Sequence, residues 1–132
     1  MIATAHFILY VADQAASAAF YRSVLGRPPA LDVPGMTEFE LAGGSVLGLM
    51  PEAGIHRLLG GALADPAAAR GVARAELYLV VADARTHHAR ALACGARELS
   101  PVTPRDWGAD VGYCQDPDGH VLAFAEPSRA GR

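Results

Sequence analysis

The alternation of apolar and polar positions predicts two successive blocks, each with one strand, one helix and three further strands. In the first block a strand-forming run is followed by Asp13, a residue type that commonly caps helices. Ala16, Phe20 and Val24 then recur with helical spacing, and Gly26 is a typical C-terminal stop. The predicted elements are a strand at Ala5–Ala12, a helix at Gln14–Leu25, and strands at Leu31–Val33, Met36–Leu41 and Ser45–Met50.

The second block repeats the first at a constant distance. Residues 75–83 align with residues 5–13 at an offset of 70 (83 − 13), and both segments end in Val-Ala-Asp. A long repeat that occurs only twice indicates a duplicated half-domain rather than a solenoid. The last two strands are joined by Asp116-Pro117-Asp118-Gly119, a typical turn sequence. The predicted elements are a helix at Ala84–Cys94 and strands at Ala75–Ala82, Arg97–Leu99, Ala109–Gln115 and Val121–Glu126.

The segment between the blocks is rich in proline, glycine and alanine and has a weaker pattern. We expect a connection that covers one face, with a short helix at Ala67–Arg70. Whether this connection acts as a lid is open. The sequence thus predicts a single α+β domain at residues 1–132, with a first module at about 1–50, a linker at about 51–73, a second module at about 74–126 and a flexible tail at 127–132. The two βαβββ modules are expected to form one curved mixed sheet around a cleft, with the helices outside.

Composition narrows the function classes. The 132-residue chain is 52% hydrophobic and 19% charged, as in globular proteins, and its net charge of −3 leaves no basic surface for nucleic acid. No apolar run approaches membrane-spanning length, and the N-terminus lacks a signal-peptide pattern, so a cytoplasmic protein is expected. Cys94 and Cys114 have neither metal-site nor disulfide-framework spacing and are expected to be reduced, packed thiols.

These features together resemble a known family. The doubled βαβββ unit, the two Val-Ala-Asp strand ends, Phe20-Tyr21 with Leu25-Gly26, and Asp116-Pro117-Asp118-Gly119 before the last strand are similar to the vicinal oxygen chelate superfamily. That superfamily includes glyoxalase I, extradiol dioxygenases, fosfomycin-resistance thiol transferases and bleomycin-resistance proteins. The resemblance covers nearly the whole chain and implies the fold more specifically than the activity.

The resemblance implies four metal-ligand positions, two in each module. The first-strand positions correspond to His6 and Glu76, which are competent ligands, whereas the last-strand positions correspond to Gly48 and Ala123, which are not. Two protein ligands make a weak site for Zn²⁺, Ni²⁺, Mn²⁺ or Fe²⁺, because catalytic sites usually keep three. Either His6 and Glu76 form a polar pair across the cleft floor, or they bind a divalent metal with a third ligand for which Glu38, Glu52 and His56 are candidates. No cofactor is expected on the first interpretation.

Strand alternation predicts which side chains face the cleft. If His6 points into it, Phe7, Leu9 and Val11 pack under the helix, and the matching positions of the other strands point inward. Trp107 lies in a loop where related proteins place ligand contacts; it either stacks on a ligand or packs internally. His87 and His88 are expected on a solvated helix face. The predicted ligand-binding residues are His6, Ile8, Tyr10, Gly48, Met50, Glu76, Tyr78, Trp107 and Ala123.

Two functions agree with this pattern. The first is a binding protein of the glyoxalase/bleomycin-resistance type, which sequesters a drug-sized molecule, as in antibiotic resistance, in an apolar cleft. The alternative is a metal-dependent lyase, isomerase or thiol transferase with a reduced ligand set, for which no catalytic residue can be named. The resemblance and the need to cover open sheet edges also predict a homodimer. Whether the cleft forms within one chain or across the dimer is open.

Overall fold

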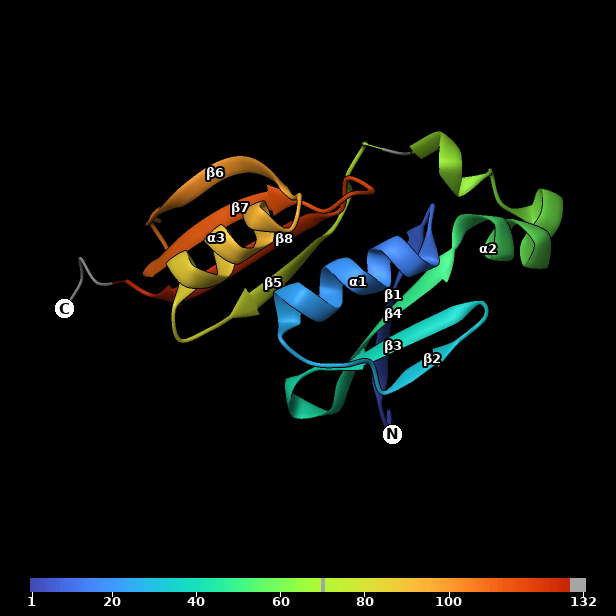
Figure 1. Ribbon diagram of the computed structural model, residues 1–132, viewed down its shortest axis with the longest axis horizontal. Helices are drawn as coiled ribbons and strands as arrows, with labels where there is room; N and C mark the ends of the chain where they lie inside the picture. Colours follow the sequence, from blue (N-terminus) through green and yellow to red (C-terminus); the bar gives the residue numbers. More distant parts are fainter. Residues whose placement is uncertain (70, 129–132) are drawn as a thin grey trace. The chain divides into compact units, whose positions relative to one another are not determined.

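The computed structural model describes residues 1–69 and 71–128 and has the expected α+β architecture (Figure 1). Internal contacts divide the chain into two compact units, residues 1–70 and 71–132. Each unit contains one βαβββ module, as predicted. The strands pair in two four-stranded sheets, one in each unit, and not in the single continuous sheet that was expected. No helix among the described residues is long and apolar enough to cross a membrane.

The first unit is built on a mixed sheet with strand order β1-β4-β3-β2. β1 runs parallel to β4, whereas the β2–β3 and β3–β4 pairs are antiparallel. The boundaries agree with the predicted ones to within one residue. The elements of the module are β1 (Ala5–Val11), α1 (Gln14–Leu25), β2 (Leu31–Val33), β3 (Met36–Glu40), the 3-10 helix η1 (Ala42–Gly44) and β4 (Ser45–Pro51).

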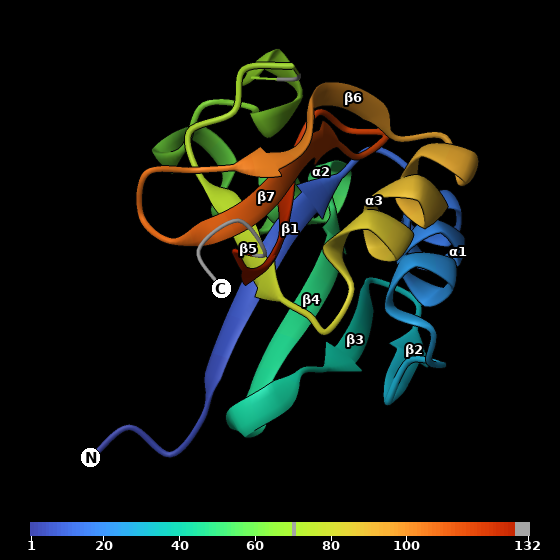
Figure 2. The same cartoon turned by 90° about the vertical axis from the view of Figure 1, so that its left-hand side faces the viewer.

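Helix α1 covers one face of this sheet, as Figure 2 shows. Its N-cap, Asp13, accepts a hydrogen bond from the backbone of Ala16 at 3.0 Å, and Gly26 ends it in the left-handed conformation with φ 68°. The buried side chains Phe20, Tyr21 and Val24 of α1 meet a sheet face that is also fully buried. That face consists of Val11, Thr37, Phe39, Leu47 and Leu49.

One prediction about this face is wrong. Phe7 was expected under the helix together with Leu9 and Val11, but its side chain is 59% exposed. β1 lies at the edge of the sheet, and α1 packs on the inner strands β4 and β3. Only the C-terminal end of β1, at Val11, is buried. Phe7 therefore points to the predicted side of the strand, but the helix does not cover it there.

The segment expected to be a linker contains an additional helix that belongs to the first unit. α2 (Glu52–Leu59) begins directly after β4, and it buries Glu52 and Ile55 against β4 and β1. The sequence signal was weak because α2 has no side-chain cap and contains Gly54. The 3-10 helices η2 (Gly60–Ala62) and η3 (Pro66–Ala69) follow. η3 overlaps the short helix that was predicted at Ala67–Arg70, of which residue 70 lies outside the described residues.

The second unit repeats the topology with strand order β5-β8-β7-β6, again with the first and last strands parallel. β6 is longer than predicted because it continues through two register shifts. β8 includes Pro127, and Ser128 donates to Asp110, so the start of the predicted tail is held in place; residues 129–132 lie outside the described part. The elements are β5 (Glu76–Val80), α3 (Ala84–Ala93), β6 (Arg97–Pro104), β7 (Ala109–Gln115) and β8 (Val121–Pro127).

Helix α3 covers one face of the second sheet, and it corrects the prediction for the histidine pair. His88 is only 5% exposed and its Nε2 lies 2.9 Å from a Glu98 carboxylate oxygen, while His87 stacks against the Phe124 ring at 5.8 Å. A solvated face was predicted because Arg85 and Arg90 flank the pair. The helix instead turns its histidine side toward the sheet, because little else along α3 is large enough to fill that space.

Candidate functional site

The outer face of the first sheet, opposite α1, carries five of the predicted site residues. His6, Ile8 and Tyr10 alternate along β1, and their register partners on β4 place Gly48 and Met50 on the same side. A Cβ atom built on Gly48 would lie 3.0 Å from Ile8 Cγ1 and 3.3 Å from the sulfur of Met36. The neighbours of Gly48 therefore fill the space that a larger residue would need.

His6 has a partner within its own unit. Its Nδ1 lies 3.4 Å from a carboxylate oxygen of Glu38, the residue that faces Gly48 across the β3–β4 ladder. Both side chains are partly exposed, so the pair contributes little to stability. It forms a polar group on an otherwise mostly apolar face. The predicted pairing of His6 with Glu76 joins the two units and stays a prediction.

The donor set does not fit the metal centre that the family resemblance implies. Gly48 and Ala123 offer no side-chain donor at two of the four positions. Within residues 1–69 and 71–128, no three histidine, cysteine or acidic side chains are grouped closely enough to hold one metal ion. His6 and Glu38 alone make two donors, fewer than catalytic zinc sites use.

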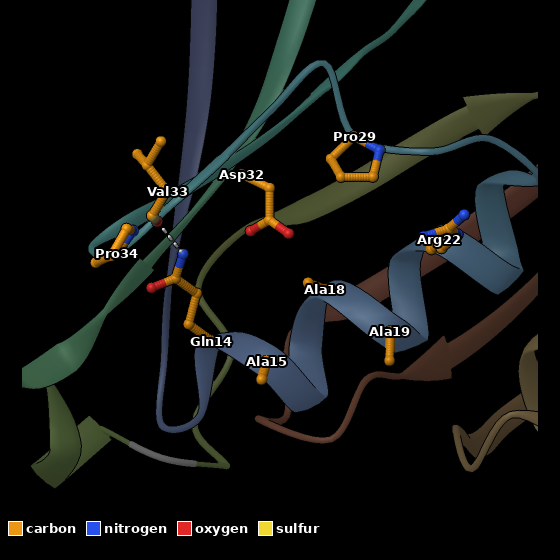
Figure 3. A pocket seen from close by; sticks show the side chains of 9 residues that line it. All are labelled: Gln14, Ala15, Ala18, Ala19, Arg22, Pro29, Asp32, Val33 and Pro34. Carbon is orange, nitrogen blue, oxygen red and sulfur yellow. Dashed lines mark hydrogen bonds between the residues drawn. The ribbon is translucent and has the colours of Figure 1, made fainter.

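The first unit also has a shallow hollow of about 530 Å³ between α1 and the β2–β3 turn (Figure 3). Its one amide side chain is fully engaged: Gln14 donates to the Val33 carbonyl and to Thr37 Oγ1, and accepts from the backbone N–H of Gly35. The remaining wall is mostly alanine and proline. The lining residues are Gln14, Ala15, Ala18, Ala19, Arg22, Pro29, Asp32, Val33 and Pro34.

The outer face of the second sheet, opposite α3, carries the other predicted residues. Phe124 touches α3 through His87, so its register partner Leu79 also faces the helix. Glu76, Tyr78 and Ala123 must then point to the opposite side, because strand side chains alternate. This facing is the one that alternation predicted. Across the ladders, Ala123 lies between Tyr78 on β5 and Tyr113 on β7.

Trp107 belongs to this face as well. Its indole Nε1 donates a hydrogen bond of 3.1 Å to the Tyr78 hydroxyl, which links the β6–β7 turn to β5 across the two intervening strands. Trp107 is 56% exposed and Tyr78 is 39% exposed, so both rings remain open to solvent. We refer to Tyr78, Trp107 and Tyr113 as the aromatic platform.

The platform stands on an apolar floor. Val111, Ala123 and Ala125 form a buried cluster against which Tyr113 packs. Ala123 is fully buried, whereas the sequence predicted it on the surface of an open cleft. Ala123 carries a single methyl group and lies between Tyr78 and Tyr113, whose larger side chains extend beyond it. What this face offers to a ligand is the aromatic layer rather than the floor.

The charges near the platform have different surroundings. Arg105 lies 5.2 Å from the centre of the Tyr113 ring, and its guanidinium donates to the Val111 and Pro101 carbonyls and to Ser100 Oγ. These acceptors lie at the register shifts of the β6–β7 ladder, where regular backbone pairing is interrupted. Arg105 thus replaces missing ladder bonds on the β6 side of Tyr113.

The pKa of the Tyr113 hydroxyl depends on burial and on the neighbouring charges. Burial raises its pKa above the usual value of 10.0, the Glu76 carboxylate raises the pKa further, and Arg105 opposes these effects. Among the neighbouring charges, Glu76 affects the pKa of this hydroxyl more than Arg105 does.

Three residues of these faces were absent from the predicted site: Glu38, which was weighed only as a third metal ligand, and Tyr113 and Arg105. Tyr113 could have been found by extending strand alternation to β7, since it lies two residues from Val111 on the same face. Arg105 could not, because its position depends on a bulge that the pattern of β6 does not reveal.

The chain is similar to known proteins in both sequence and structure. The family model of the Glyoxalase/Bleomycin resistance protein/Dioxygenase superfamily matches residues 3–124. A glyoxalase-related enzyme from Fulvimarina pelagi has 26% sequence identity and a TM-score of 0.79, over 92% of this chain and 86% of that one. A glyoxalase/bleomycin resistance protein/dioxygenase from Nocardioides has 25% identity and a TM-score of 0.73, over 97% of this chain and 85% of that one.

A protein from Agrobacterium tumefaciens has 27% identity and a TM-score of 0.74, over 97% of this chain and 99% of that one. No curated protein matches the sequence. The family model covers far more than half of the chain, and the doubled βαβββ topology agrees with it. This protein therefore belongs to the Glyoxalase/Bleomycin resistance protein/Dioxygenase superfamily.

Proposed function

We propose that this protein binds a drug-sized small molecule, in the manner of the bleomycin-resistance members of its superfamily. The observation that carries the proposal is the aromatic platform on the outer face of the second sheet. Large aromatic side chains that remain exposed and are fixed by a mutual hydrogen bond are typical of recognition surfaces. The ligand stacks on this layer above the floor of Val111, Ala123 and Ala125.

The names of similar proteins support a small-molecule function, but they do not distinguish binding alone from catalysis. The Fulvimarina pelagi protein is described as a glyoxalase-related enzyme, and the Nocardioides protein as a glyoxalase, bleomycin resistance protein or dioxygenase. Binding alone is favoured over metal-dependent catalysis because the donor set falls short of a metal centre.

The metal-dependent alternative has a direct test. We expect the protein, purified without added metal, to contain well under one equivalent of Zn, Ni, Mn or Fe per chain, since Gly48 and Ala123 replace donors. Elemental analysis by mass spectrometry measures this. A stoichiometric metal that is lost in both His6→Ala and Glu38→Gln would overturn the binding-only proposal and favour the enzyme.

The binding proposal is tested with a panel of aromatic fragments of neutral, cationic and anionic type, detected by ligand NMR. We expect a subset to bind, and Trp107→Leu to abolish that binding. The matched control is Ala19→Phe, which fills the hollow beside α1 and leaves the second sheet unchanged. Loss of binding in Ala19→Phe alone would move the site to that hollow, and a panel without binders at millimolar concentration would contradict the proposal.

Ala123→Phe is a poor probe of this site, although Ala123 is one of the predicted ligand-binding residues. Ala123 is fully buried, so a phenyl ring there must displace Tyr78 or Tyr113. Tyr78→Leu is the better second variant. It removes one wall of the platform from a side chain that is already 39% exposed, and so it separates lost binding from lost folding.

A further inference from the structure

We infer that the platform selects flat aromatic cations, with Glu76 as the charge that distinguishes them from neutral and anionic rings. The inference rests on the proposed function, since it names the class of ligand that the same face takes. It is built from three features of the second unit: the exposed rings, the surroundings of Glu76 and the engagement of Arg105.

The exposed rings supply the stacking surface. Trp107 and Tyr78 are held by their hydrogen bond of 3.1 Å, so a ligand that stacks on them does not have to order them first. The two residues come from the β6–β7 turn and from β5, and the bond fixes these distant segments relative to each other. The indole face also attracts cations more strongly than the other aromatic side chains do.

Glu76 supplies the negative charge. It lies two positions before Tyr78 on β5 and therefore on the same face, roughly 7 Å away along the strand. Its carboxylate makes no hydrogen bond or ion pair with any residue in the described part of the chain, and the residue is exposed. A carboxylate that is paired with no cation among residues 1–69 and 71–128 remains available to a ligand. The stronger influence of Glu76 than of Arg105 on the Tyr113 hydroxyl agrees with this.

Arg105 lies beside Tyr113 and would favour an anion, but its guanidinium is already engaged in hydrogen bonds. Nε donates to the Val111 carbonyl, while Nη2 donates to Val111, Pro101 and Ser100. These four hydrogen bonds hold the guanidinium to β6 and β7, on the side of Tyr113 that faces away from Ala123. The Arg105 guanidinium thus stabilises the irregular β6–β7 pairing, whereas the Glu76 carboxylate remains available to a ligand of the aromatic platform.

Three bicyclic probes of similar size test the inference: N-methylquinolinium, quinoline and 2-naphthoate at pH 7.5, where quinoline is neutral. Trp107 is the single tryptophan of the chain, so its fluorescence reports binding at the platform directly. We expect N-methylquinolinium to bind most tightly. Glu76→Gln should weaken its binding about tenfold and leave quinoline unchanged. Glu40→Gln removes one exposed charge from the first unit and should change neither.

The outcomes separate the inference from the function on which it rests. If all three probes bind equally and Glu76→Gln has no effect, the inference is wrong while binding at the platform stands. If 2-naphthoate binds most tightly, the field at the platform is positive and the inference is also wrong. If none of the three probes quenches Trp107 or binds by calorimetry, the inference fails, and the fragment panel then decides whether the proposed function fails as well.

Discussion

At the scale of single residues, Gly112 shows how a backbone position is dictated by a neighbouring helix. A Cβ atom at this position would lie 2.6 Å from Val102 Cγ2 and 2.7 Å from His88 Nδ1, closer than real contacts allow. His88 Nδ1 is itself buried without a hydrogen-bond partner within the described residues, while Nε2 meets the Glu98 carboxylate. A carboxylate can only accept, so in the neutral ring Nε2–H donates the hydrogen bond to Glu98 and Nδ1 is left as an unprotonated acceptor.

This contact predicts the cost of one methyl group. Gly112→Ala should lower the free energy of unfolding by about 2 kcal/mol, because either α3 or β6 must move to make room. Gly61→Ala is the control, since a Cβ there meets no atom within 4 Å. Urea denaturation of the two variants measures the difference. Equal stabilities would show that α3 yields without cost.

Cys114 is the residue from which a pH dependence follows. Its side chain is fully buried, and burial raises the pKa of the thiol from 9.0 to about 11, with smaller contributions from Asp116 and Glu98. A raised pKa means that the folded state keeps its proton while the unfolded state loses it. The stabilisation is therefore complete below pH 9 and is lost as the pH rises towards 11.

We expect the free energy of unfolding to fall by about 2 kcal/mol between pH 8 and pH 11 because of this thiol. The chain has no lysine, so no side-chain ammonium group titrates in this range. Tyr113 acts in the same direction, and for this reason the measurement is the difference between wild type and Cys114→Ala in urea at several pH values. Parallel curves for the two proteins would contradict the prediction.

At the scale of elements, the two helices begin in the same way. Asp13 caps α1 through the backbone of Ala16 at 3.0 Å, and Asp83 caps α3 through the backbone of Thr86 at 3.1 Å. Thr86 also donates its hydroxyl to Asp83 at 2.8 Å. The duplicated Val-Ala-Asp sequence is thus a strand end and a helix cap in both units.

Replacing either cap by alanine should lower the free energy of unfolding by about 1 kcal/mol, because a first-turn N–H loses its acceptor. Asn at the same position keeps an acceptor oxygen and should restore most of the stability. Chemical denaturation of Asp13→Ala, Asp13→Asn and the matching Asp83 variants measures this. An Asn variant as unstable as its Ala counterpart would show that charge, rather than the hydrogen bond, is what matters.

At the scale of the whole molecule, open sheet edges remain. Within residues 1–69 and 71–128, β1 and β5 each pair with one strand, and they carry the exposed side chains of Phe7 and Val80, 59% and 73% accessible. Unpaired edges with exposed apolar residues are what self-association commonly covers. The homodimer predicted from the sequence would cover one or both of these edges.

We therefore expect a dimer in light scattering at micromolar concentration, and Phe7→Asp should shift it towards the monomer. Leu58→Asp, at a 70% exposed position of α2, is the control and should leave the dimer intact. A stable monomer for the unmodified protein would end the dimer prediction. Dissociation by Leu58→Asp alone would place the interface on α2.

The sequence by itself determined the order of strands and helix in both modules and the alternation of faces along their strands. Capping residues, glycine stops and apolar spacing act within a few residues of one another, which is why α1, β2 and β7 have the predicted limits. The strict period of a strand also determined that Glu76 and Tyr78 lie opposite the helix. The duplication, read from the match of residues 5–13 to residues 75–83, determined the topology of each unit.

Only the tertiary structure decided which of these side chains meet. His6 pairs with Glu38, which is 32 positions away (38 − 6), and Trp107 bonds to Tyr78 across 29 positions (107 − 78). His88 meets Glu98 across 10 positions (98 − 88), and its burial depends on how the whole of α3 packs. Such contacts depend on strand order and on bulges, neither of which leaves a local signal. Side-chain packing decided which residues are buried. Ala123 is buried and Phe7 is exposed, because burial depends on the neighbours across the sheet and not on the pattern along the strand.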